Sequence, residues 1–142
     1  MHNSDNSNAS GRLLLIDRDP AQAQIVAETL AQCLDQAVGI TVVPGGKPAA
    51  EMLRENTYDI VLADLSSLGD LGSHSDDAVL RLVRLARGAL LVALSDGISV
   101  SSAVGALRAG AHDYVAKPIN GPAMAARIDE LAQRHGKCGS LG

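Results

Sequence analysis

Aromatic residues are nearly absent from this chain of 142 residues, which has no Phe, no Trp and only 2 Tyr. A hydrophobic core must therefore be built from Leu, Val, Ile and Ala, and these residues suit β-strands that helices cover on both faces. The length fits one domain, and a hydrophobic content of 46% is enough to bury a real core. We expect one compact α/β domain.

Cysteine and basic residues are also scarce. Cys33 and Cys138 are too far apart to form a disulfide framework or a zinc site, which favours a reducing cytoplasm. A net charge of −4 without any Lys/Arg cluster argues against direct contact with nucleic acid by this segment. No apolar run is long enough to span a bilayer, and the polar start lacks the pattern of a signal peptide. We therefore expect a cytoplasmic chain without a membrane contact.

Short apolar runs rich in Val, Ile and Leu alternate with stretches of helical period. This alternation is typical of successive β-α-β units and predicts a parallel sheet. The five predicted strands are residues 12–16, 40–43, 59–63, 89–94 and 113–116. The first, third and fourth runs are continuously apolar, as central parallel strands are.

Five helices are predicted between and after these strands. The first begins at Asp19 and Pro20, which supply an N-cap and a first-turn proline. Its predicted apolar face consists of Ile25, Val26, Leu30 and Leu34. The other four are expected at 49–55, 78–87, 99–109 and 120–135. Residues 1–11 are interpreted as a disordered lead-in and residues 136–142 as a linker or the end of an expressed piece, which leaves 12–135 as the domain.

Polar residues collect after the predicted strands, at their carboxyl ends. In doubly wound sheets, ligands gather at that edge. The residues are Asp17 and Asp19 after the first strand, Asp64 after the third, Ser95 and Asp96 after the fourth, and Lys117 with Pro118 after the fifth. Carboxylates can hold a hard cation such as Mg²⁺, while a hydroxyl and an ammonium can bind phosphoryl oxygens. The set therefore predicts a phosphoryl-transfer site.

Four segments give the chain a family resemblance. LLLIDRDP, YDIVLADL, ALLVALSD and AGAHDYVAKPI follow one another in the order and spacing of the signature segments of response regulator receiver domains, from bacterial two-component signalling. The resemblance covers residues 12 to about 135. It implies a flavodoxin-like, doubly wound sheet of five parallel strands in the order 2-1-3-4-5. Helices 1 and 5 would cover one face, and helices 2, 3 and 4 the other.

The resemblance also implies a role for each polar residue. Asp64 would be the nucleophile that accepts a phosphoryl group from a sensor histidine kinase or phosphotransfer protein. Ser95 would bind that group, and Lys117 would balance its charge. Tyr114 would be the aromatic switch that follows Ser95. Pro118 would be the proline that is commonly cis in this family.

The family's metal is Mg²⁺. On this chain the implied ligands are Asp17, Asp64 and the backbone carbonyl of Ser66, whereas Asp19 is a doubtful ligand because it stands where many members have a helix cap. The resemblance further implies that phosphorylation remodels the surface of helix 4, strand 5 and helix 5, about residues 98–135, where an effector or a second copy binds. The domain would signal rather than act as an enzyme. The chain would be either a stand-alone receiver or a piece of a larger regulator, and the glycine-containing tail favours a piece, with an output domain that regulates transcription in the full-length protein.

Two residues depart from the family at the predicted pocket. Arg18 stands where the family has a second acid that binds the metal directly. Its guanidinium could bridge Asp64 or Asp96 in place of the metal, or it could turn into solvent and leave a weakened Mg²⁺ site. Asp96 adds bulk and negative charge where the family has a small residue, and it could equally pair with Arg18.

The loop after Asp64 also departs from the pattern. It carries Leu68 and Gly69 in place of a Pro-Gly pair, and it is a few residues longer than is typical of the family. His74 in this loop is expected to be exposed to solvent, because no second ligand accompanies it.

Two other functions stay open at this point. A pseudo-receiver that binds partners or dimerises without phosphorylation is favoured by Arg18 and Asp96 and opposed by Asp64, Ser95 and Lys117. A flavodoxin-like module for flavin or nucleotide is compatible with the fold, but the chain has neither GxxxxGK[ST] nor GxGxxG.

Overall fold

The computed structural model describes residues 11–34, 38–97 and 99–135, and the following statements concern these residues. The predicted lead-in at 1–11 and the predicted tail at 136–142 lie outside this part of the chain, except for Gly11, which is the first residue of a strand. Within the described part, no helix is both long and apolar enough to cross a membrane.

Five parallel strands form a single sheet in the order β2-β1-β3-β4-β5, as the resemblance implied. The strands are β1 Gly11–Ile16, β2 Val38–Val43, β3 Ile60–Asp64, β4 Leu90–Ser95 and β5 Asp113–Ala116. The three continuously apolar runs are the three inner strands, as predicted. Asp64 and Ser95 were expected after their strands, but both are the last residue of one, because their backbones pair with Leu94 and Ala116.

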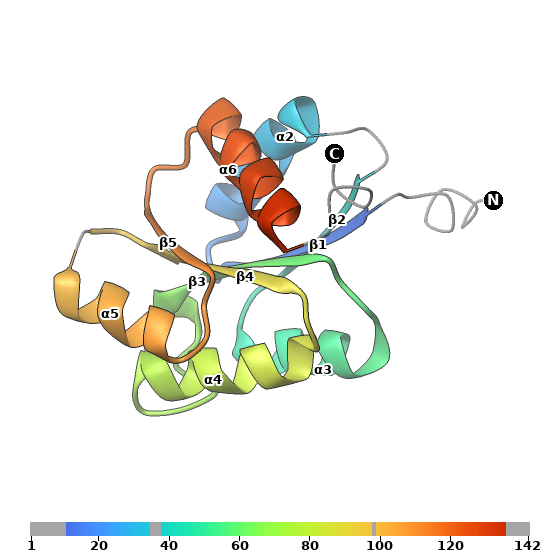
Figure 1. The fold of residues 1–142 in the computed structure, drawn as a ribbon. Coiled ribbons are helices and arrows are strands. Elements are labelled where there is room, and N and C mark those ends of the chain that lie inside the picture. Colours follow the sequence, from blue (N-terminus) through green and yellow to red (C-terminus); the bar gives the residue numbers. More distant parts are fainter. Residues whose placement is uncertain (1–10, 35–37, 98, 136–142) are drawn as a thin grey trace.

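Helices cover both faces of the sheet (Figure 1). α2 and α6 lie on one face, and α3, α4 and α5 lie on the other, in agreement with the expected arrangement. Their bounds are α2 Pro20–Cys33, α3 Gly46–Glu55, α4 Ser75–Ala86, α5 Val100–Arg108 and α6 Gly121–Arg134. A short 3-10 helix that was not predicted, η1 Leu65–Ser67, directly follows β3. It turns the chain at the point where the site lies.

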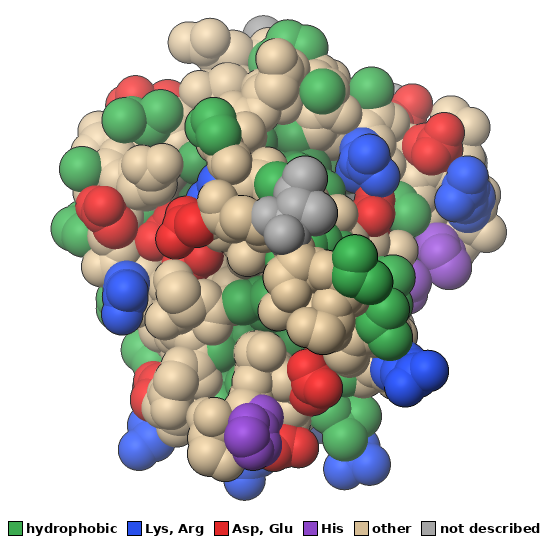
Figure 2. All heavy atoms as spheres, turned by 90° about the vertical axis from the view of Figure 1, so that its left-hand side faces the viewer, with side chains coloured by type: hydrophobic (Ala, Val, Ile, Leu, Met, Phe, Trp, Pro, Cys, Tyr) green, Lys and Arg blue, Asp and Glu red, His purple; other side chains and the backbone are tan. Residues whose placement is uncertain are grey.

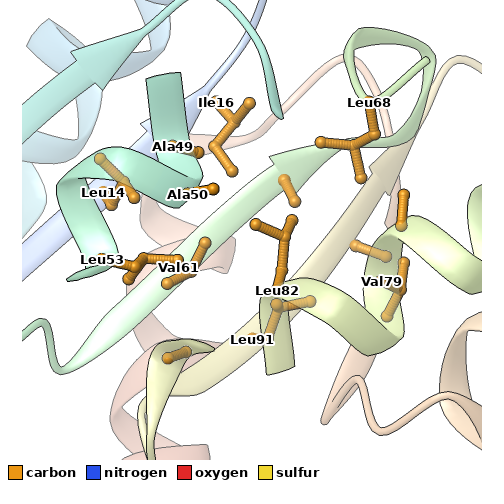
Figure 3. Close-up of a cluster of buried hydrophobic side chains, with 14 of the residues drawn as sticks. Leu14, Ile16, Ala49, Ala50, Leu53, Val61, Leu68, Val79, Leu82 and Leu91 are labelled. Carbon is orange, nitrogen blue, oxygen red and sulfur yellow. The ribbon is translucent and has the colours of Figure 1, made fainter. Parts of the chain in front are cut away.

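Successive residues of the inner strands point to opposite faces and so build two cores. Leu14 and Ile16 of β1 pack with α3 and α4, and this larger core is drawn in Figure 3. Leu13 and Leu15 pack with α2 and α6. Because β1, β3 and β4 are buried on both faces, the carboxyl ends of these strands are held rigidly beside one another.

The predicted inner face of α2 was wrong at one position. Ile25 is 61% exposed, whereas Val26 and Leu30 are buried as expected and Ala23 is buried with them. The buried residues follow one another at intervals of three and four, which keeps them on one side of the helix. Ile25 lies about 100° around the helix from Val26 and therefore faces solvent.

α3 begins three residues earlier than predicted because its cap comes from another part of the chain. The carboxylate of Asp70 accepts hydrogen bonds from the backbone N–H of Gly46 at 3.0 Å and of Lys47 at 2.9 Å. The first backbone N–H groups of a helix have no partner within the helix, and a side chain close in sequence usually accepts their hydrogen bonds. Asp70 thereby ties the loop after β3 to α3.

Candidate functional site

Asp17, Asp64 and Lys117 meet at the carboxyl edge of the sheet. The ammonium Nζ of Lys117 lies 3.0 Å from Oδ1 of Asp64 and 3.6 Å from Oδ2 of Asp17. The side chains are 10%, 2% and 4% exposed for Lys117, Asp64 and Asp17. One largely buried cation therefore neutralises two buried carboxylates that follow or end different strands.

The other oxygen of Asp64 is held by two serines of η1. Oδ2 accepts a hydrogen bond from the hydroxyl of Ser66 at 2.7 Å and from the hydroxyl of Ser67 at 2.6 Å. Ser67 is buried, and its Oγ in turn accepts the backbone N–H of Arg18 at 2.8 Å. Ser67 thus connects the loop after β1 with the carboxylate at the end of β3, a role that the sequence did not indicate.

Asp19 is a helix cap and lies apart from the ion pairs. Its Oδ1 accepts the backbone N–H of Ala21 at 3.1 Å and of Gln22 at 3.2 Å, which are free donors in the first turn of α2. The backbone N–H of Asp19 donates to Oδ1 of Asp17 at 2.9 Å and so orients that carboxylate. The expectation that Asp19 serves as a cap is confirmed.

The hydrogen bonds around Asp64 shift its acidity. Burial alone raises the pKa of Asp64, but the hydrogen bonds from Ser67 and Ser66 and the charge of Lys117 outweigh burial, so the pKa of Asp64 is lowered. Burial alone lowers the pKa of Lys117, but its hydrogen bond and charge interaction with Asp64, with further help from Asp17 and Asp96, raise that pKa. At neutral pH the pair is an ionised carboxylate beside an ammonium ion.

Of the two alternatives for Arg18, the solvent-facing one is present. Arg18 is exposed and forms no ion pair with any residue that the structure describes. The alternative in which Arg18 bridges Asp64 or Asp96 is not found among the described residues, and the cation beside both carboxylates is Lys117. Asp96 is 81% exposed and lies 3.7 Å from Nζ of Lys117, so it pairs weakly with Lys117 rather than with Arg18.

Ser95 and Tyr114 converge on Gly97. The Oγ of Ser95 accepts the backbone N–H of Gly97 at 3.5 Å, and the hydroxyl of Tyr114 donates to the carbonyl of Gly97 at 3.1 Å. The Lys117–Pro118 peptide bond is cis, as expected, and the backbone N–H of Lys117 donates to the carbonyl of Ser95 at 2.7 Å. Two predicted switch residues therefore share one short segment between β4 and α5.

Two carboxylates at this edge fit a hydrated Mg²⁺ ion. Among the described residues there is no group of three or more His, Cys, Asp or Glu that could hold a metal. Asp17 and Asp64 remain, and each is oriented by a backbone or hydroxyl donor. Since Mg²⁺ keeps several of its waters and often takes only one or two carboxylates, these residues fit the ion with one ligand fewer than an Asp at position 18 would give.

Other polar residues lie apart from the ion pairs. His74 is exposed at the N-cap of α4, as expected for a residue that is not a ligand. α5, at the left of Figure 1, exposes three large apolar side chains, which are Val100 at 78%, Val104 at 39% and Leu107 at 47%. Figure 2 is turned toward that side of the molecule and shows apolar side chains between polar ones on its surface.

Comparison with known proteins shows to which family this sequence belongs. Residues 13–129 match the family model described as the response regulator receiver domain. The transcriptional regulatory protein CutR of Streptomyces coelicolor is 32% identical over 124 residues, which are 87% of this chain and 54% of CutR. The DNA-binding response regulator MtrA of Mycolicibacterium smegmatis is 30% identical over 87% of this chain and 51% of MtrA. The chain thus spans about half the length of these relatives.

Solved structures share the fold at lower identity. A receiver domain protein (CheY-like) from Methanospirillum hungatei has a TM-score of 0.77 and 20% identity, over 89% of this chain and 97% of that one. A response regulator from Burkholderia pseudomallei, solved with a phosphorylated aspartic acid, a calcium ion and citrate, has a TM-score of 0.71 and 21% identity. That match covers 87% of this chain and 72% of the other.

Proposed function

The chain belongs to the response regulator receiver domain family, and from that premise we propose that Asp64 accepts a phosphoryl group from the phosphohistidine of a sensor kinase or phosphotransfer protein. The observation that carries the proposal is the 3.0 Å contact between Nζ of Lys117 and Oδ1 of Asp64. An ammonium ion at this distance can stabilise the negative charge on a transferred phosphoryl group.

The transfer needs an ionised nucleophile with one free oxygen. The lowered pKa of Asp64 keeps its carboxylate charged at neutral pH. Ser66 is exposed, so its hydroxyl can turn away from Oδ2, which then keeps only the bond from Ser67 and has a lone pair for the attack. A new P–O bond forms on Asp64 while the P–N bond of the phosphohistidine breaks, and the imidazole leaves with its electron pair and takes up a proton.

Mg²⁺ fits the same proposal. The carboxylates of Asp17 and Asp64 and the backbone carbonyl of Ser66 would hold the ion, and the ion would neutralise charge on the phosphoryl oxygens. Because Arg18 stands in place of a third acid, binding of Mg²⁺ is expected to be weaker than in a pocket with an Asp at that position. Arg18 is exposed and can turn toward the bound phosphoryl group instead.

The signal would leave the pocket through the segment around Gly97. A phosphoryl group on Asp64 would accept a hydrogen bond from the hydroxyl of Ser95, and a turn of that side chain toward the phosphoryl group would break the weak 3.5 Å bond that its oxygen accepts from Gly97. The hydroxyl of Tyr114 donates to the same Gly97, so movement there releases Tyr114 as well. The exposed apolar residues of α5 lie directly after this segment and form the proposed surface for an effector or a second copy.

The relatives suggest what that effector is. CutR and MtrA are a transcriptional regulatory protein and a DNA-binding response regulator, and about half of each lies outside the matched region. We therefore place this domain in the cytoplasm, next to an output domain that regulates transcription in the full-length protein.

A pseudo-receiver remains the second candidate because of one specific observation. Each carboxylate oxygen of Asp17 and Asp64 has a hydrogen-bond or ion-pair partner, although Oδ1 of Asp64 has only the ion pair with Lys117, and Asp64 is only 2% exposed. A carboxylate that is held in this way can serve a structural purpose. In that case, the domain would bind its partner without phosphorylation.

Intact-mass spectrometry separates the two candidates. The protein is treated with acetyl phosphate and Mg²⁺ as wild type, Asp64→Asn and Arg18→Asp. We expect a phosphoryl adduct in the wild type, no adduct in Asp64→Asn, and faster labelling in Arg18→Asp. If the wild type stays unmodified while Arg18→Asp is labelled, the pseudo-receiver is the correct reading. An adduct that persists in Asp64→Asn would refute Asp64 as the acceptor.

A further inference from the structure

α3 and α4 lie side by side on one face of the sheet (Figure 1). Residues of both helices line a pocket of about 260 Å³. Its lining consists of Ala50, Arg54, Leu71, Arg81, Arg84 and Leu85. We refer to this pocket and these six residues as the arginine trough. It shares none of its lining residues with the edge that carries Asp17, Asp64 and Lys117.

The trough concentrates positive charge in an acidic protein. The chain has 16 Asp and Glu against 12 Lys and Arg, so acidic partners are in excess. Nevertheless, Arg54, Arg81 and Arg84 form no ion pair within the part of the chain that the structure describes. Glu51 and Glu55, on the same helix as Arg54, do not line the trough, but they line a neighbouring hollow together with Arg54 and Val43. Three arginines and no carboxylate line the trough itself, and such a lining attracts an anion.

One of the three arginines is already fixed in position. The Nη1 of Arg81 donates to the carbonyl of Leu71 at 3.0 Å, which uses only part of the donor capacity of the guanidinium. Arg84 lies three residues later on α4, and residues at that spacing are neighbours on a helix surface. Arg54 reaches the pocket from α3 on the other side. Two neighbouring arginines of α4 and a third from α3 suit a phosphate with several free oxygens.

The floor of the trough is apolar. Ala50 and Leu71 are buried and Leu85 is half-buried, so a ligand that carries only charge would leave this surface unused. A second hollow of about 150 Å³ shares Arg54 and Leu85 with the trough and extends it toward Glu55, Asn56 and Arg87. Pockets for small ligands combine an apolar lining with a few polar groups in this way.

We propose that the arginine trough binds a small organic phosphate of the size of a mononucleotide. The phosphate lies between Arg81 and Arg84 and faces Arg54, while the planar part of the ligand rests on Ala50, Leu71 and Leu85. Guanidinium groups also stack on planar rings, which adds to this fit. The arginines contact the phosphate and the apolar residues contact the planar part of the ligand. A bare anion or an uncharged nucleoside should therefore bind more weakly than a nucleotide.

Isothermal titration calorimetry with three probes tests the proposal on the full chain. ADP should bind with saturation below about 1 mM, pyrophosphate should bind more weakly, and adenosine should not bind measurably. Arg84→Gln and Arg54→Gln should each weaken ADP binding by about tenfold or more, as expected for the loss of a charge-assisted hydrogen bond. Arg108→Gln is the matched control, because Arg108 is an exposed arginine on α5 outside the trough, and it should leave binding unchanged.

Several results would overturn the proposal. Binding of ADP that is lost in Lys117→Met but kept in Arg84→Gln would place the nucleotide at the carboxyl edge of the sheet. Absence of ADP binding in wild type, together with Arg84-dependent binding of a Glu-rich peptide, would assign the trough to a protein partner. Equal weakening by Arg84→Gln and Arg108→Gln would reveal only general attraction to charge.

Discussion

The carboxyl edge of the sheet and the arginine trough differ in whether their charged side chains are buried and paired. At the edge, the carboxylates of Asp17 and Asp64 are almost fully buried, and the ammonium of Lys117 lies within 3.6 Å of both. In the trough, Arg54 and Arg84 are exposed to solvent and have no acidic partner among the described residues. Both regions lie on the same small domain, and they differ in how much water reaches the charged atoms.

Burial explains the difference. A buried charge without a partner is costly, so a fold that buries Asp64 must also supply Lys117 and the hydroxyls of Ser66 and Ser67. An exposed guanidinium keeps its hydration and needs no partner. The charges at the edge are therefore tied to the stability of the fold, whereas those in the trough are available to a ligand. Substitutions in the two regions should separate these two roles.

The largest effect is expected for Lys117→Met, which removes the shared cation. Two buried carboxylates would then face each other, and the free energy of unfolding at pH 7 should fall by roughly 3 kcal/mol. Urea denaturation measures the change. Lys47→Met is the matched control, because Lys47 is an exposed lysine in the first turn of α3, and it should cost less than about 0.5 kcal/mol. Similar midpoints for the two variants would contradict the structural role of Lys117.

Ser67→Ala should have the next largest effect. It removes the hydroxyl that donates to Asp64 and accepts the N–H of Arg18, both within the interior of the site. A loss of about 1–2 kcal/mol in the free energy of unfolding is expected. Ser66 donates to the same oxygen of Asp64 but is exposed, so Ser66→Ala should lower the free energy of unfolding by less. The order of the two urea midpoints checks the prediction, and the reverse order would refute it.

A smaller effect is expected in the pH dependence of stability. The pKa of Asp64 is lowered by folding, so its contribution is present above the ordinary aspartate pKa of about 4 and is lost as the pH falls through the lower folded value. The urea midpoint of the wild type should therefore fall more steeply below about pH 4 than that of Asp64→Asn. All other carboxylates are common to both proteins. Parallel curves would mean that folding leaves the acidity of Asp64 unchanged.

The sequence predicted the sheet well, because the pattern of apolar residues records burial directly. The continuously apolar runs became the inner strands β1, β3 and β4. The strand ends at Asp64 and Ser95 were missed because backbone pairing continues through polar residues. The start of α3 was missed since its cap, Asp70, is 24 residues from Gly46 and belongs to a different loop. Contacts between distant segments leave no local pattern.

At the site, too, local sequence patterns predicted some features, whereas features that depend on contacts between distant segments were missed. The convergence of Asp17, Asp64 and Lys117 followed from strand ends and from the family resemblance. The direction of Arg18 did not, because the sequence alone does not tell which cation, Arg18 or Lys117, lies beside the carboxylates. Ser67 was missed because a serine in a loop is common, and only the turn of η1 brings its hydroxyl back to Asp64. The one available signal was the pair of serines directly after Leu65.

The smallest effect on stability is expected in the trough, for Arg84→Gln. The substitution relieves repulsion from Arg81, which lies three residues away on α4, but it also removes a favourable cation from the last turn of that helix. These opposing terms should leave the free energy of unfolding within about 0.5 kcal/mol of wild type. Urea denaturation at low and high salt checks this, because salt screens both terms. A cost comparable to that of Ser67→Ala would mean that Arg84 holds the fold together, and its charge would then not be free for a ligand.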